Sequence, residues 1–295
     1  MSKILEIQNL SVTLNQKQKT TQLVSGVNFN IEKGQCIGIL GESGSGKSML
    51  CKGIMGLLDR NFDITGRVLF DEMDLNAADQ EQRRKYRGKD MGMILQNPMT
   101  CFDPLYTIGY QMNETFKVHT YFSKKEINEK IIRTLNLMQI ENPEDVIKKY
   151  PHQLSGGMLQ RVMIGLSLAL NPKLIIADEP TTDIDSITQF EIIKEFIRIK
   201  KEHEVAMIFV SHDLGVIAKV ADYVLVMHNG EVVDEGSVED IFQHATNSYT
   251  RDLVEKRMQV MSQFKDVLSK RKRKEGRHGR MGRNSCPGKR CGSEF

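Results

Sequence analysis

The chain has 295 residues, of which 40% are hydrophobic and 27% are charged, and its formal net charge is +3. A chain of this length can bury a full core, as one large domain or two small ones. No run approaches the roughly 18 consecutive apolar residues of a membrane span, and no long apolar segment follows Met1. We therefore expect neither a spanning helix nor a signal peptide.

The positive charge is concentrated at the C-terminal end. Residues 270–295 contain ten Lys and Arg and two acidic residues, a net charge of +8, whereas residues 1–269 contain 31 basic and 36 acidic residues, a net charge of −5. A mildly acidic body does not favour nucleic acid as a partner. The five scattered cysteines fit a reduced cytosolic protein better than a disulfide framework.

Alternation of apolar and polar residues predicts two strands near the N-terminus, joined by a polar turn over residues 16–22. The almost wholly apolar run QCIGILG predicts a buried parallel strand that leads into a helix. The predicted elements of this half are strands at 4–14, 23–31, 35–41, 66–75 and 90–95 and a helix at 47–58.

The second half begins with a polar, helical region over residues 105–150. Beyond it, apolar strands alternate with helices, which predicts a mostly parallel α/β sheet. The Asn229-Gly230 dipeptide predicts a hairpin turn near the end of the sheet. The predicted elements here are helices at 158–170, 187–203 and 214–221, strands at 174–178 and 205–213, and a strand–turn–strand at 222–236.

The stretch GESGSGKS matches the phosphate-binding pattern G-x-x-x-x-G-K-[ST], between an apolar strand and a helix. Its glycines let backbone N–H groups surround phosphate oxygens, and the helix N-terminus adds partial positive charge. Lys47 is expected to contact the β- and γ-phosphates and Ser48 to ligate Mg²⁺. The predicted nucleotide site consists of Gly41, Glu42, Ser43, Gly44, Ser45, Gly46, Lys47 and Ser48.

The stretch LIIADEP is an apolar strand that ends in two carboxylates. Asp178, at the strand end, is placed to hold Mg²⁺, and Glu179 to polarise the attacking water. Gln96 and His212 also follow apolar strands, so Gln96 is expected to contact the Mg²⁺ or the water and His212 the γ-phosphate. Taken alone, a surface glutamine and a loop histidine are the commoner explanations of these two residues.

A second glycine-containing stretch, LSGGMLQR, lies at residues 154–161 and opens a helix. Such a helix start favours an anion. Several motifs occur in one order along the chain, and together they resemble the nucleotide-binding domain of ABC ATPases. They are the phosphate-binding loop, Gln96, LSGGMLQR, LIIADE, Asp185 and His212. The resemblance covers residues 1 to about 255. It implies a P-loop NTPase (RecA-like) α/β core with an antiparallel β edge and an inserted α-helical subdomain at about residues 97–160.

The resemblance also implies a second, homologous ATPase subunit that pairs head to tail with the first. LSGGMLQR is similar to the family's signature motif, so Ser155, Gly156 and Gly157 would cap the γ-phosphate bound by the other subunit. Asp185 would couple the two sites, whereas Arg161 is expected to make a structural or interface contact. A C-terminal helix at 256–269 and a disordered tail at 270–295 complete the predicted organisation.

A free-standing transporter ATPase is favoured over DNA-repair and ribosomal members of the family, since the chain has no long heptad insertion and one P-loop. The implied partners are two membrane permeases and, indirectly, an extracellular solute-binding protein, and the implied location is the cytoplasmic face of the membrane. The proposed docking residues for a permease coupling helix are Phe102, Leu105, Tyr106 and Ile108, for which core packing is the alternative.

Finer resemblance concerns the cargo. Five short stretches of the sequence resemble the ATPases of the peptide/nickel importer family, namely QNP, FDPL, TIG, ADEPTT and NSYTRDLV. The methionine after the glycines of LSGGMLQR is similar to the branch that imports nickel and metal–opine chelates. Import of nickel or a metal chelate is therefore the preferred interpretation, with dipeptide or oligopeptide import as the alternative. The ATPase itself does not contact the cargo.

The family has an aromatic residue that stacks on adenine at the end of the first strand, where this chain has Leu14. Stacking on a base is worth about 1–3 kcal/mol in other settings. We therefore expect Leu14→Tyr to bind ATP more tightly than the unaltered chain in a nucleotide titration. Unchanged affinity would contradict the assignment of this position.

Overall fold

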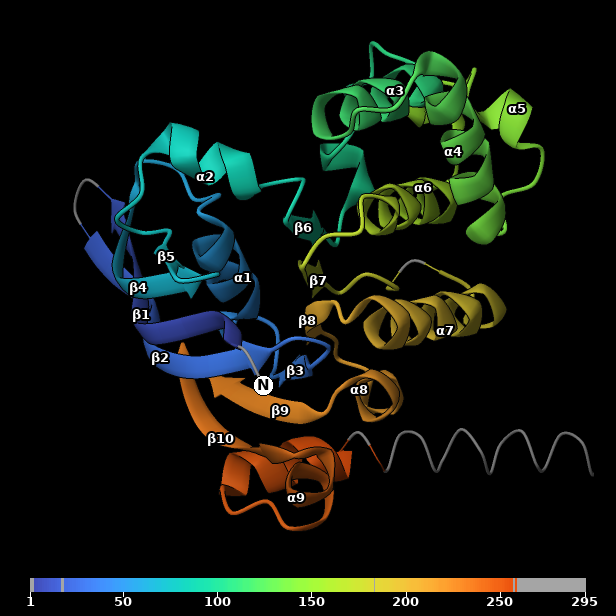
Figure 1. Ribbon diagram of the computed structural model, residues 1–295. Helices are drawn as coiled ribbons and strands as arrows, with labels where there is room; N and C mark the ends of the chain where they lie inside the picture. Colours follow the sequence, from blue (N-terminus) through green and yellow to red (C-terminus); the bar gives the residue numbers. More distant parts are fainter. Residues whose placement is uncertain (1–2, 17–18, 183, 257, 259–295) are drawn as a thin grey trace, which may run out of the picture. The chain divides into compact units, whose positions relative to one another are not determined.

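The computed structural model describes residues 3–16, 19–182, 184–256 and 258 (Figure 1). The chain divides into two compact units, residues 1–250 and 251–295. All elements discussed below belong to the first unit. The predicted tail and most of the predicted C-terminal helix lie outside the described residues, and the predicted domain boundary at residue 255 stays a prediction.

A six-stranded sheet forms the centre of the first unit, in the order β10-β9-β3-β8-β7-β6. Five strands are parallel, and β10 pairs with β9 in the antiparallel sense. Every residue of β3, β7 and β8 is buried, as expected for strands covered on both faces. The strands are β3 (Cys36–Leu40), β6 (Met91–Ile94), β7 (Leu174–Asp178), β8 (Ala206–Val210), β9 (Tyr223–His228) and β10 (Glu231–Ser237).

The predicted hairpin between the last two strands is confirmed. Asn229 and Gly230 both have positive φ, 49° and 85°, as a two-residue hairpin turn requires. The helices that follow or precede the parallel strands are α1 (Lys47–Met55), α6 (Gly156–Ala169), α7 (Ser186–His203) and α8 (Leu214–Val220), and α9 (Val238–Gln243) follows β10. The expected P-loop NTPase architecture is therefore present.

A second, antiparallel sheet has the order β2-β1-β4-β5. Its strands are β1 (Lys3–Gln16), β2 (Lys19–Glu32), β4 (Phe62–Phe70) and β5 (Met73–Asp74). The predicted polar turn over 16–22 was too long, because the ladder continues to a Gln16–Lys19 pair and polar side chains suit its exposed end. The predicted strand over 66–75 is divided by a turn at Asp71 and Glu72, both with positive φ. One hydrophobic core joins this sheet, α1 and the parallel strands.

Between β6 and β7 the chain forms the expected helical insertion, which Figure 1 shows as a group of green helices. It contains α3 (Ile108–His119), α4 (Lys124–Leu137) and α5 (Pro143–Val146), and α6 follows them. Apart from Thr134, the buried residues of α3 and α4 are apolar and lie at helical spacing, and α4 packs on both α3 and α6. No helix in the described part of the chain is long and apolar enough to cross a membrane.

The short helix α2 (Gln80–Tyr86) was not predicted. It buries no residue, so it lacks the apolar periodicity that reveals other helices. The signal in the sequence is its capping box, in which Asp79 and Gln82 exchange side-chain and backbone hydrogen bonds. Its last turn leads to Arg87, whose Nε and Nη2 donate to the Met55 and Gly56 carbonyls at the end of α1.

Arg87 thus satisfies carbonyls that a helix end leaves without an intrahelical partner. We expect Arg87→Ala to lower the free energy of unfolding by about 1.5–3 kcal/mol, the usual worth of hydrogen bonds from a charged group. Urea denaturation measures the difference. Arg84→Ala, on the exposed side of α2, is the matched control and should change stability by less than about 0.5 kcal/mol; equal losses would contradict the capping role.

Candidate active site

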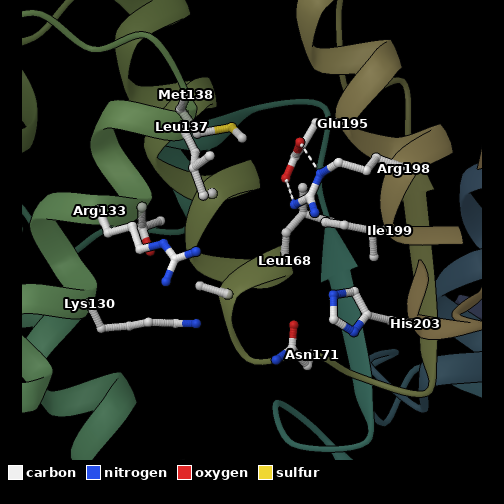
Figure 2. Close-up of a pocket in the computed structure, with 13 residues that line it drawn as sticks. Lys130, Arg133, Leu137, Met138, Leu168, Asn171, Glu195, Arg198, Ile199 and His203 are labelled. Carbon is white, nitrogen blue, oxygen red and sulfur yellow. Dashed lines mark hydrogen bonds and ion pairs between the residues drawn. The ribbon is translucent and has the colours of Figure 1, made fainter. Parts of the chain in front are cut away.

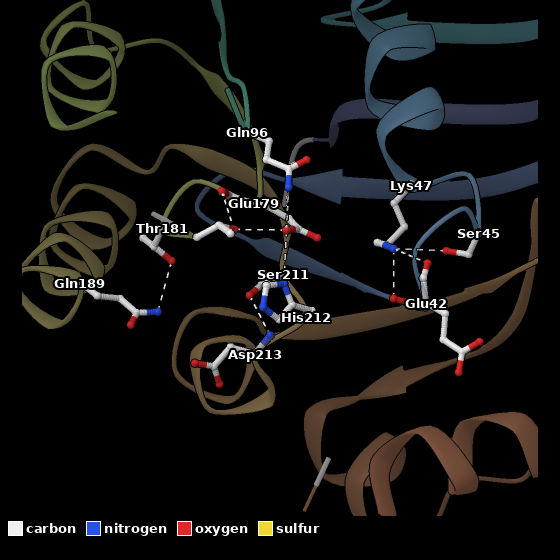
Figure 3. A network of polar contacts seen from close by, with 12 residues as sticks. Glu42, Ser45, Lys47, Gln96, Glu179, Thr181, Gln189, Ser211, His212 and Asp213 are labelled. Carbon is white, nitrogen blue, oxygen red and sulfur yellow. Dashed lines mark hydrogen bonds and ion pairs between the residues drawn. The ribbon is translucent and has the colours of Figure 1, made fainter. Parts of the chain in front are cut away.

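The phosphate-binding loop connects the end of β3 with the start of α1, as predicted (Figure 3). Lys47 begins α1, and its side chain is buried inside the loop. Its Nζ donates to the carbonyls of Gly41 at 3.0 Å and Glu42 at 2.8 Å and to Ser45 Oγ at 3.3 Å. A cation buried among loop carbonyls is held ready for an anion at the helix N-terminus.

Two glycines of the loop have no room for a side chain. A Cβ on Gly41 would lie 2.4 Å from the Met227 carbonyl oxygen, and one on Gly46 would lie 2.6 Å from the Leu23 carbonyl oxygen. Both residues also have positive φ, 154° and 101°. The loop is therefore packed against backbone from the two sheets, and its shape depends on glycine at these positions.

Asp178 ends β7 and is only 3% exposed. Burial raises the pKa of this carboxyl, while a hydrogen bond with the Ser48 hydroxyl and the charges of Lys52 and Lys47 oppose that rise. One of its oxygens, Oδ1, is buried without a hydrogen-bond partner in the described chain. Since β7 and β3 are separated by β8 alone, their ends lie roughly 10 Å apart. Ser48 and Asp178, each predicted to hold Mg²⁺, meet across this distance through their hydrogen bond.

Glu179 follows Asp178 directly, and its Oε2 atom is the centre of a polar cluster (Figure 3). Gln96 Nε2 and Thr182 Oγ1 donate to this oxygen at 3.3 and 3.1 Å, and His212 Nδ1 lies 3.2 Å away. An ionised carboxylate only accepts hydrogen bonds, so it would accept one from His212 in the tautomer with a proton on Nδ1. The structure thus brings the predicted residues Gln96, Glu179 and His212 together.

The backbone of Glu179 is itself unusual. Its φ is 49°, in the left-handed region that few residues other than glycine adopt. Its backbone N–H donates to the Val210 carbonyl at the end of β8. Neighbouring strands therefore hold both the backbone and the side chain of this residue.

The glycine pair of LSGGMLQR lies at the start of α6. Ser155 is the N-cap, and its Oγ accepts from the Met158 N–H at 3.3 Å. Gly156 is exposed and a Cβ on it would meet nothing within 4 Å. The first N–H groups of a helix have no intrahelical acceptor, so those of Gly156 and Gly157 are available at the surface.

Gln160 and Tyr249 were missed as contributors to this site. Gln160 is buried in α6, and its Nε2 donates to the carbonyls of Pro180 at 2.8 Å and Leu95 at 3.3 Å, beside the ends of β7 and β6. Tyr249 Oη accepts from the Glu42 N–H at 3.0 Å. The Gln160 amide was visible within LSGGMLQR, but no local pattern connects Tyr249 with a loop two hundred residues earlier.

Two other predicted residues have structural contacts. Arg161 Nη1 donates to the Gln139 carbonyl at 2.9 Å, which fits the structural contact expected of it. Asp185 is the N-cap of α7 and accepts from the Ile187 and Thr188 N–H groups, which hold the pKa of its carboxyl below the usual value. Its predicted role between two subunits stays a prediction.

The predicted docking residues divide into two groups. Phe102 and Ile108 are buried, so their assignment to a docking surface was wrong and the core alternative holds for them. Leu105 and Tyr106 are exposed, 78% and 46%, and Tyr106 stacks on the equally exposed Tyr110 at a ring-centroid distance of 4.7 Å. Leu14 is partly buried on β1, opposite Phe62 of β4.

Comparison with known proteins agrees with this geometry. Residues 24–182 match the ABC transporter family. A metal-staphylopine import system ATP-binding protein of Staphylococcus aureus (strain Mu50) is 46% identical over 265 residues, which cover 90% of this chain and 97% of the relative. A dipeptide transport ATP-binding protein of Bacillus subtilis (strain 168) is 41% identical, with 86% and 76% covered.

The fold has counterparts among solved structures. A dimeric, post-hydrolysis state of an ATP-binding cassette bound to ADP and phosphate superimposes with a TM-score of 0.73 at 28% identity, covering 79% of this chain and 98% of that one. This chain thus combines the P-loop, the Asp178–Glu179 strand end and the glycine pair on α6 with 46% and 41% identity to two ATP-binding proteins of transport systems. The chain belongs to the ABC transporter family and is one of its ATP-binding, ATP-hydrolysing subunits.

Proposed function

We propose that the chain binds MgATP, hydrolyses it in a head-to-tail dimer with a second ATPase subunit, and thereby drives import of nickel or another metal ion held by a small organic chelator. The cluster around Glu179 carries the catalytic part of this proposal. The similarity to the metal-staphylopine import protein over 90% of this chain carries the cargo part.

The residues at the end of β7 suit Mg²⁺. One oxygen of the buried Asp178 carboxylate has no hydrogen-bond partner among the described residues, and the Ser48 hydroxyl lies beside this carboxylate. Mg²⁺ prefers such oxygen ligands. Gln96 directs its amide N–H toward Glu179, so its carbonyl oxygen is the atom left for the ion. When bound, Mg²⁺ neutralises charge on the phosphate oxygens.

Glu179 is suited to accept the proton of the attacking water. Its three hydrogen-bond neighbours, Gln96, Thr182 and His212, all engage Oε2. They hold the carboxylate in one orientation and leave Oε1 to the water. His212, whose Nδ1 faces the same carboxylate oxygen, is proposed to contact the attacking water and the γ-phosphate as well. Lys47, at the start of α1, stabilises negative charge on the phosphates from the side of the P-loop.

A second subunit would complete the site. The N–H groups of the exposed Gly156 and the half-buried Gly157, with the Ser155 hydroxyl, form a helix start that suits a phosphate held elsewhere. The dimeric cassette with ADP and phosphate is a precedent for pairing within the fold. We infer that the partner is a homologous ATPase and that its P-loop supplies the nucleotide capped by these residues.

The exposed group of Leu105, Tyr106 and Tyr110 supports contact with a membrane permease. Aromatic and aliphatic side chains exposed together on a surface suit a partner helix in a groove. Two permeases would hold the chain at the cytoplasmic face of the membrane, and a solute-binding protein outside the cell would deliver the cargo to them.

Peptide import is the second candidate. Dipeptide and oligopeptide transport ATP-binding proteins are 39–41% identical to this chain. The ATP site is common to both interpretations because the ATPase does not contact the cargo. Only a measurement of which cargo is transported distinguishes the two interpretations.

We expect Glu179→Gln to retain ATP binding and to lose at least about 100-fold in hydrolysis rate, because the amide cannot accept the proton of the water. Nucleotide titration and phosphate release by the purified chain measure the two quantities. Glu129→Gln, an exposed glutamate on α4, is the matched control and should keep full activity. Near-normal turnover of Glu179→Gln would overturn the assignment.

We expect cells that lack this chain to lose uptake of labelled nickel supplied with a small chelator, and the unaltered gene to restore it. Lys47→Ala should fail to restore uptake, because the P-loop cation is gone. Unchanged metal uptake, together with loss of labelled dipeptide or oligopeptide uptake, would replace the metal cargo by peptides and leave the ATPase assignment intact.

A further inference from the structure

A cavity of about 190 Å³ lies between α4 and α6 of the helical insertion and α7 beside the parallel sheet (Figure 2). Lys130 and Arg133 of α4 extend into it from one side, and Arg198 and His203 of α7 line the other. No residue of the P-loop or of the cluster around Glu179 lines it. It is therefore separate from the active site.

The two walls of the cavity differ in how their cations are paired. Arg198 is bound by Glu195, with Nε and Nη2 at 2.9 and 2.6 Å from its carboxylate oxygens, and also by Glu202. Lys130 and Arg133 have no carboxylate within 4.0 Å among the described residues. The cavity therefore holds two cations whose charge no carboxylate of a described residue neutralises.

These two cations lie one turn apart on the same face of α4. Partial burial of Lys130 and the charge of the nearby Arg133 lower the pKa of Lys130, as two like charges placed close together do. Glu195 is the one acid among the described lining residues, and it already accepts two hydrogen bonds from Arg198. An anion is thus the ligand that complements this wall in charge.

The size of the cavity limits the anion. It equals roughly six water volumes and is smaller than the roughly 300 Å³ at which sites for drug-sized ligands begin. A guanidinium binds carboxylate and phosphate oxygens in pairs. The Asn171 side chain adds an amide at the floor of the cavity, where Figure 2 shows it between the two walls.

We propose that this cavity is a binding site for a small multivalent anion bearing phosphate or carboxylate groups, held by Lys130 and Arg133. Such a ligand would connect α4 of the insertion with α6 and α7, next to the parallel sheet. The site does not depend on the proposed cargo or on the mechanism of hydrolysis.

Isothermal titration of the full-length chain with inorganic pyrophosphate and, separately, with citrate in metal-free buffer tests the site. All proteins carry Lys47→Ala, so that the P-loop does not bind the probe. We expect Lys130→Gln/Arg133→Gln to weaken binding of at least one probe at least about tenfold, since two charge-assisted contacts are lost. The relative loss for the two probes distinguishes phosphate from carboxylate ligands.

Lys124→Gln/Lys125→Gln removes the same charge from the same helix and is the matched control, expected to change affinity less than twofold. Ala169→Leu, which fills the cavity without altering charge, should also weaken binding. Equal weakening by the two double variants would show binding to bulk positive charge, including residues 270–295, and would overturn the site. Absence of binding to both probes in the Lys47→Ala protein would overturn it as well.

Discussion

The parallel pairing of β3, β8 and β7 is the constraint on which the site depends. It brings the carboxyl ends of three strands to one edge, so that the P-loop, Asp178 and the segment of His212 start from fixed positions. The apolar residues of these strands have little freedom to shift, because a change of register by one residue would move every side chain to the other face. Catalytic geometry is thus maintained by burial of residues that take no part in the chemistry.

In the described part of the chain, polar contacts between the helical insertion and that edge come from Gln160. Gln160 connects α6 to the ends of β6 and β7 through two carbonyls, so the helix that presents Gly156 and Gly157 is tied to the strands that carry Gln96 and Glu179. The cavity lined by residues of α4, α6 and α7 lies at the same junction between the insertion and the sheet. A ligand there would act on the position of the insertion, whereas nucleotide acts on the edge of the sheet.

The sequence was sufficient for the parallel strands, their order along the chain and the residues at their ends, because burial on both faces produces apolar runs that local patterns reveal. It was insufficient where contacts are distant or side chains are exposed. The exposed helix α2 has no apolar face, and Tyr249 reaches Glu42 only through the fold. Apolar residues such as Ile108 and Leu105 look alike in sequence, and only packing separates core from surface.

The left-handed backbone of Glu179 has a consequence for the evolution of such enzymes. A residue other than glycine in this conformation costs of order 1–3 kcal/mol, and the surrounding strands must offset that cost. Glycine or asparagine at this position would relax the backbone and remove the carboxylate that we propose accepts the proton of the water. Selection for thermal tolerance and selection for turnover therefore act in opposite directions at one residue, and a heat-adapted chain that kept its activity would have to gain its stability elsewhere.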